Sequence, residues 1–291
     1  MRLFLLLLLT LSVIAKTEFP KAPPSPNDQA LMNFFYGAIS EKKDHRKALS
    51  TLEHIHNDSK FDSKEYEKMM MPQVIENILY LYWILEDLDG CEKYVLARKR
   101  EWDEAYYSDN FLHAAKVHIN RSDFKKARET LDQILKEDPT FKAPHFFYAF
   151  MDIKEKNFKS AYEHLEKLTH IDESNSQIPL LKGICLYRMG EFKKAEEELG
   201  TSLDRKNDAV TRFFYALVLN KLGDTETALR ILKLAKWMYD HGQYDQSYLL
   251  KKYDKEFADD VLPDIEALDK EFHSKGLDTT AIEGEKPPNA Q

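Results

Sequence analysis

Histidine is the side chain most often used as a metal ligand, and the chain has 10 histidines. Residues on one face of a helix lie three or four positions apart, whereas the closest histidines here are separated by two, five and six positions. The spacing therefore predicts no metal site for these pairs, which are His54 with His56, His113 with His118, and His164 with His170.

Other chemical motifs are also absent from the sequence. It contains no glycine-rich phosphate loop, no G-x-S-x-G nucleophile elbow and no H-E-x-x-H zinc motif. Carboxylates run together at Glu196-Glu197-Glu198, as on any charged helix face that water covers. We therefore expect no catalytic, cofactor-binding or metal-binding residue, and we expect the chain not to be an enzyme. An accessory or metal-dependent enzyme component, with a site built from dispersed histidines and carboxylates, stays open as an alternative.

Three methionines, Met69 to Met71, stand directly before Pro72. Their thioethers could bind copper or form an adaptable apolar surface. Proline is favoured in the first turn of a helix, so the pattern is better interpreted as a loop that meets a helix start at Pro72.

The elements that must position any site follow an internal repeat. A small residue recurs 34 positions apart in the middle of the chain and once more 33 positions later, at Ala127, Ala161, Ala195 and Ala228. A phenylalanine precedes the first three of these alanines, and a leucine follows each of the four by one helical turn. A second series of small residues keeps the same register upstream, at Ala115, Ala149, Gly183 and Ala216.

Two antiparallel helices in contact explain why each unit needs two small residues. Helices approach to about 8–10 Å only where the side chains at the crossing are small. Within residues 124–135 the apolar residues fall at helical spacing, with charged residues between them. Turn signals such as Leu222-Gly223-Asp224 separate the two helices of a unit.

This register resembles the tetratricopeptide repeat, a helix-turn-helix unit of 34 residues. The segments "SDFKKARETLDQILKEDP" and "GEFKKAEEELGTSL" match its second half. The resemblance implies an all-α fold, a right-handed α-solenoid of helix-turn-helix repeats with C-terminal capping helices. It covers four repeats in residues 108–240. Residues 29–107 form divergent repeats, in which Tyr94 replaces the small residue and the register of 57–107 stays open.

The ends of the chain differ from the repeats. Residues 1–15 combine Arg2, an apolar run and Ala15, so we expect a signal peptide that is cleaved near Ala15 and a protein that is periplasmic or secreted. Residues 16–28 are proline-rich and are expected to be an extended linker. We expect capping helices in 241–275, divided before Pro263, and a disordered tail in 276–291. Cys91 and Cys185 lie about three repeats apart, which predicts free thiols.

The tetrapeptide FFYA or FFYG occurs three times, starting at Phe34, Phe146 and Phe213. In tetratricopeptide proteins the first helix of each repeat lines the concave face, so the resemblance implies a partner-binding groove of mostly apolar residues. Its predicted members are Leu112, Lys116, Phe146, Phe150, Leu180, Ile184, Tyr187, Phe213 and Leu217. The structural alternative is that a C-terminal helix fills this groove.

These observations predict a non-catalytic interaction scaffold or adaptor that binds an apolar peptide or helix of a partner protein. The formal net charge of -8 argues against a nucleic-acid partner, which normally requires a basic surface. We expect no cofactor and no membrane span, because the N-terminal apolar run is shorter than the roughly 20 residues that cross a bilayer. Self-association through the ends of the repeat array is a further alternative.

Overall fold

The computed structural model describes residues 20, 22–40, 44–97, 104–168, 177–206, 208–241 and 248–280, with only the helical backbone given for 104–107 and 248–260. These residues form thirteen helices and no strand, so the all-α fold is confirmed. The helices are α2 (Pro26–Ser40), α3 (His45–Asp58), α4 (Lys64–Ile84), α5 (Leu88–Ala97), α6 (Glu104–Asn120), α7 (Phe124–Glu137), α8 (Ala143–Lys154), α9 (Phe158–Glu166), α10 (Gln177–Arg188), α11 (Phe192–Arg205), α12 (Ala209–Leu222), α13 (Thr225–Asp240) and α14 (Tyr248–Ser274).

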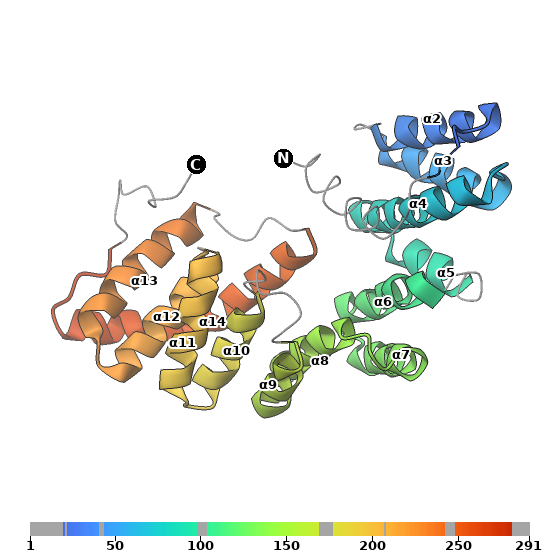
Figure 1. The fold of residues 1–291 in the computed structure, drawn as a ribbon. Coiled ribbons are helices and arrows are strands. Elements are labelled where there is room, and N and C mark those ends of the chain that lie inside the picture. The colour runs from blue at the N-terminus through green and yellow to red at the C-terminus, as the bar shows by residue number, and fades with distance from the viewer. Residues whose placement is uncertain are drawn as a thin grey trace. The chain divides into compact units, whose positions relative to one another are not determined.

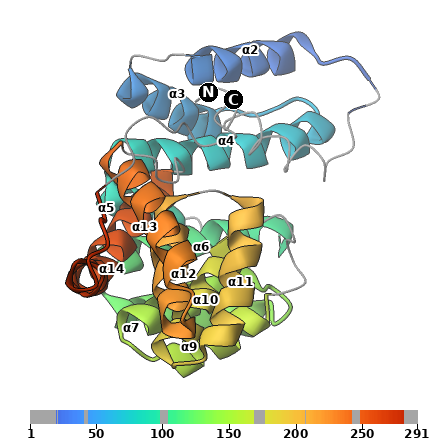
Figure 2. The same ribbon diagram turned by 90° about the vertical axis from the view of Figure 1, so that its left-hand side faces the viewer.

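The chain divides into two compact units, residues 1–141 and 142–291, called unit 1 and unit 2 below. Unit 1 contains the hairpins α2/α3, α4/α5 and α6/α7, and unit 2 contains α8/α9, α10/α11, α12/α13 and the long helix α14. Within each unit, the first helix of a hairpin packs on the second helix of the preceding hairpin. Figure 2 shows this order in unit 1, where α2, α3 and α4 lie side by side.

The small residues of the repeat sit where helices cross, as the sequence predicts. Ala127, Ala161, Ala195 and Ala228 are all fully buried. Gly183 shows why the position must be small: a Cβ atom added there would lie 2.5 Å from Cγ of Leu199 in the other helix of its hairpin. Close approach of two backbones is therefore a property of the hairpin itself.

The turn inside each hairpin from α4/α5 to α12/α13 uses one residue with a left-handed backbone. This residue is at the same place in five successive hairpins, at Glu86, Ser122, Lys156, Gly190 and Gly223, with φ between 56° and 91°. In each turn its N–H donates to a carbonyl three residues back, and the next N–H donates to a carbonyl five residues back. These bonds satisfy the carbonyls left open at the end of the first helix.

Side-chain caps fix where several second helices begin. Asp123 and Asp224 occupy equivalent positions directly after two of these turns, and each accepts a hydrogen bond from the backbone N–H three residues ahead. Both carboxylates thus satisfy an amide that has no partner inside the helix.

Two prolines lie inside helices, which corrects the sequence interpretation. Helix α4 begins after Ser63, whose Oγ accepts a hydrogen bond from the N–H of Glu65, so Pro72 is not a helix start. Helix α14 continues through the exposed Pro263, so one capping helix replaces the two that were expected.

The chain ends also differ from expectation. Helix α2 begins at Pro26, inside the predicted linker, with Ser25 Oγ accepting from the N–H of Asp28. Tyr66 donates a hydrogen bond to the carbonyl of Ala22, which holds the preceding segment on α4. Residues 276–280 are part of the described structure, and Thr279 is buried within them. The predicted signal peptide lies outside the described residues.

Candidate interaction surface

The inner face of unit 2 is the surface formed by the first helices of its hairpins, α8, α10 and α12. On α12, Phe213, Leu217 and Asn220 follow each other at helical spacing and therefore share one side of the helix. On α10, Leu180, Ile184 and Tyr187 do the same. The sequence predicts that the apolar residues of this row, together with Phe146 and Phe150 of α8, line a partner-binding groove.

Most of this row is buried within the chain. Phe150, Leu180, Ile184, Phe213 and Leu217 are at most 6% exposed, whereas Phe146 and Tyr187 keep part of their surface open to water. Whether a partner binds these residues stays a prediction.

Helix α14 covers α12 on this side. It packs directly on α12, and Figure 1 shows it crossing the hairpins of unit 2. Asn220 Nδ2 donates to Glu271 Oε2 of α14 over 3.2 Å, which turns the side of α12 that carries Phe213 and Leu217 toward α14. The inner face of unit 2 therefore accommodates an amphipathic helix, and that helix is part of the same chain.

Ion pairs hold α14 on both flanks. Arg188 of α10 lies 2.7 Å from a carboxylate oxygen of Asp264, and Lys236 of α13 lies 2.5 Å from one of Asp269. Burial, together with the charge of Asp264, raises the pKa of Tyr187. Two carboxylates of α14, Asp264 and Asp269, thus meet basic side chains of the repeats.

The repeated aromatic tetrapeptide has three different environments. Its first phenylalanine is 62% exposed at Phe34 on α2, partly exposed at Phe146 on α8, and 1% exposed at Phe213 on α12. Phe213 also contacts the ring of Tyr239, with centroids 5.8 Å apart. The same sequence block is therefore covered only where further helices lie against it.

The corresponding face of unit 1 is polar. Leu112 is apolar and buried. Lys116, one turn further along the same side of α6, is a basic residue whose pKa is lowered by burial. Glu76 of α4 has its pKa raised to about 7 by burial and by the charge of Asp109. This surface mixes opposite charges, and whether a partner binds Leu112 or Lys116 stays a prediction.

A polar contact between α4 and α6 contains a histidine without charge. The Trp83 Nε1–H donates to His113 Nδ1 over 2.9 Å. Burial, reinforced by the charge of Lys116, holds the pKa of His113 well below its usual value. His113 is therefore a neutral acceptor that joins α4 to α6. His118, five residues further along α6, does not join this contact. Its Nε2 atom lies 3.6 Å from Oε1 of Glu92 in α5.

A second histidine contact was missed by the sequence analysis. His145 Nδ1 of α8 and His164 Nδ1 of α9 are 3.1 Å apart, and Tyr148 stacks on the ring of His164. Burial, then the charges of Lys167, His164 and Lys142, lower the pKa of His145 to about 4. Comparing spacings along a single helix could not find this pair, whereas the repeat register, which sets α8 against α9, could have.

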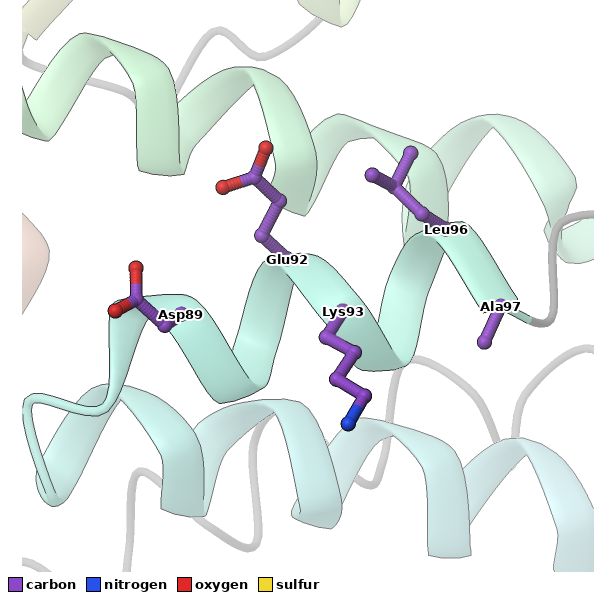
Figure 3. Close-up of a pocket in the computed structure, with 5 residues that line it drawn as sticks. All are labelled: Asp89, Glu92, Lys93, Leu96 and Ala97. Carbon is purple, nitrogen blue, oxygen red and sulfur yellow. The ribbon is translucent and has the colours of Figure 1, made fainter.

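A surface pocket of about 560 Å³ lies along α5 (Figure 3), lined by Asp89, Glu92, Lys93, Leu96 and Ala97. Asp89 and Glu92 both form ion pairs with Arg121, which follows α6. The carboxylates of this pocket therefore join neighbouring hairpins, and we assign them a structural role.

Both cysteines of the chain lie within the described residues. Cys91 and Cys185 are free and buried, and burial raises the pKa of each thiol to about 12. Among these residues, no three histidine, cysteine, aspartate or glutamate side chains gather closely enough to hold a metal ion. None of the described helices combines the length and apolar character that crossing a membrane requires.

Comparison with known proteins identifies the repeats. Two family models described as tetratricopeptide repeat match residues 109–140 and 152–217. No curated protein matches the sequence at a significant level.

Solved structures share the fold at low sequence identity. A tetratricopeptide repeat protein from Parabacteroides merdae is 14% identical, with a TM-score of 0.53, and the match covers 86% of this chain and 97% of that one. The C-terminal part of a repeat-containing protein from Cytophaga hutchinsonii is 15% identical, with a TM-score of 0.52, and the match covers 84% and 95%.

Proposed function

We propose that this chain, which carries tetratricopeptide repeats, is a non-catalytic scaffold that binds a helical or extended segment of a partner protein. Proteins of this repeat family are generally interaction scaffolds without catalytic activity. The single observation that carries the finer proposal is the position of α14 on the inner face of unit 2. A surface that seats one amphipathic helix has the shape and the apolar character to seat another.

The energy available on this face supports such binding. A buried aromatic side chain removes about 150–250 Å² from water, which corresponds to several kcal/mol at about 25 cal/mol/Å². Costs of association consume much of this energy. Two or three aromatic anchors on the inner face, Phe146 and Tyr187 among them, would still give binding in the micromolar range.

The partly exposed anchors provide the test of binding. Crosslinking in the native cell followed by mass spectrometry would identify the partner, and purified partner would then be titrated with Phe146→Ala and Tyr187→Ala chains. We expect weaker binding by about tenfold for each anchor that the partner covers. Phe34→Ala, which removes an exposed ring in unit 1, is the matched control. Equal affinity in all chains would place the binding site elsewhere.

We also propose that the chain is exported and acts in the cell envelope or outside the cell. The support is the sequence of residues 1–15, with one basic residue, a short apolar run and a small residue at Ala15. Mass spectrometry of the mature protein and cell fractionation test this part separately. A mature protein that retains Met1 and Arg2 in the cytoplasmic fraction would contradict it.

A further inference from the structure

We propose that α14 is a removable occupant of the inner face of unit 2, and that the partner which replaces it presents an acidic amphipathic helix with the same pattern. This inference rests on the proposed scaffold function and goes beyond it, because it specifies the chemistry of the partner and makes binding depend on release of the chain's own helix.

The apolar pattern of α14 is the first part of the argument. Val261, Ile265, Leu268 and Phe272 follow at intervals of four, three and four, which places them on one side of the helix. All four are at most 4% exposed. A helix with this spacing is a ligand of the helix-in-groove type, in which a few apolar anchors carry the recognition.

Charge complementarity is the second part. Asp264, Asp269 and Glu271 flank the apolar side of α14, and they meet Arg188, Lys236 and Asn220 of the repeats. Just beyond the helix, Asp278 lies 3.8 Å from Lys233. The receiving surface therefore selects carboxylates on both flanks of an apolar stripe.

The strength of these polar contacts favours exchange. The four side chains of the Arg188–Asp264 and Lys236–Asp269 pairs each keep about a quarter to a third of their surface in water. Ion pairs at this exposure contribute little to stability, although they set register and partner choice. A competing helix that reproduces both the anchors and the carboxylates can therefore replace α14 without leaving a buried charge unpaired.

The tether is the third part. Helix α13 ends at Asp240 and α14 begins at Tyr248, so the helix is attached close to the face it covers. A short link gives a tethered ligand an effective concentration on the order of millimolar. The partner binds only those chains in which α14 has left the face. Its apparent affinity therefore falls in proportion to the fraction of chains in which the face is free.

The test uses a fluorescein-labelled peptide of residues 257–280 as the probe, titrated with the full chain. Asp264→Arg sets two arginines against each other when α14 is seated, so it weakens the resident helix without changing the receiving face. We expect this chain to bind the probe about fivefold more tightly than the wild type. Glu266→Arg changes the same charge two residues away at an exposed position, and it should bind like the wild type.

A locked chain keeps the proposal falsifiable if Asp264→Arg does not fold. Asn220→Cys/Glu271→Cys, joined by a short bismaleimide, fixes α14 on α12, while Cys91 and Cys185 are buried and protected. We expect the locked chain to bind the probe at least about tenfold more weakly than the same double variant without the linker. Equal binding in the locked and unlocked chains, or no binding in any chain, would overturn the proposal.

The partner identified by crosslinking separates this inference from the proposed function. Partner binding that is equal in locked and unlocked chains would leave the scaffold function intact and reject the removable helix. Loss of partner binding on locking supports the inference. Sizing that shows α14 exchanged between two copies of the chain would identify a second copy as the occupant and reject the acidic partner helix.

Discussion

His145 and His164 come from the two helices of one hairpin and face each other through their Nδ1 atoms, 3.1 Å apart. A hydrogen bond at this distance requires one nitrogen to carry a proton and the other to be an acceptor. Protonation of both rings would replace this bond with repulsion. The contact therefore ties the stability of α8 and α9 to pH.

The folded-state pKa of His145 is about 4, below its ordinary value of 6.5. Between these values the unfolded chain binds more protons than the folded chain, so the free energy of unfolding rises with pH across this window. Acidification from pH 7 to pH 5 should cost unit 2 about 1 kcal/mol, a figure reduced for solvent screening. Urea unfolding at both pH values measures it. His145→Phe should lose the difference, whereas His241→Gln, at an exposed site, should keep it.

Gly183 and Gly200 form a matched pair for testing the helix crossing. Alanine is favoured over glycine in a helix by about 1 kcal/mol. Gly200→Ala should gain this energy, because a Cβ there meets no atom within 4 Å. Gly183→Ala must displace Leu199, so it should be less stable than Gly200→Ala by about 1–3 kcal/mol. Equal free energies of unfolding would show that Leu199 moves aside freely.

Lys156 carries a left-handed backbone, with φ 64°, at the turn between α8 and α9. Such a conformation costs a residue other than glycine about 1 kcal/mol. Lys156→Gly should therefore raise the free energy of unfolding by roughly 0.5–1 kcal/mol, despite the greater freedom of glycine in the unfolded chain. Lys154→Gly, at the last residue of α8, is the control and should lower the free energy of unfolding. A loss of stability on Lys156→Gly would mean that its side chain makes a contact of greater value.

Lys182 is a buried cation whose side chain is 4% exposed, paired with Glu166 and with Glu198 at 3.6 Å. Lys182→Ala removes both pairs and leaves a cavity, so it should destabilise unit 2 by about 3–5 kcal/mol. Lys182→Met keeps most of the volume and should cost less, because the carboxylates left without the cation, Glu166 and Glu198, are 50% and 27% exposed and stay in contact with water. Thermal unfolding of both variants makes the comparison, and equal losses would show that charge outweighs packing.

The helix hairpins could be predicted from the sequence because they depend on local periodicity. Each repeat needs a small residue where its two helices pack together. The four alanines at this position, Ala127, Ala161, Ala195 and Ala228, are all buried. The prolines show the limit of local rules. Pro72 and Pro263 both lie inside helices, and α4 is already capped by Ser63, nine residues before Pro72.

The candidate site was less predictable, because it depends on which surfaces meet. Nothing in the pattern around Phe213 distinguishes it from Phe34, yet one is buried and the other is 62% exposed. The difference arises from helices placed against the first and not against the second. Likewise, the polar face of unit 1 follows from the clustering of Glu76, Asp109 and Lys116, which lie on two separate helices.

The left-handed turn residue recurs in five hairpins with the same two hydrogen bonds, although the residue itself changes from glutamate to serine, lysine and glycine. Because this turn keeps the same hydrogen bonds, the five hairpins are alike in how the backbone joins their two helices. The backbone bonds of this turn do not depend on the side chain, so its sequence can change while the two helices that it joins keep the same connection.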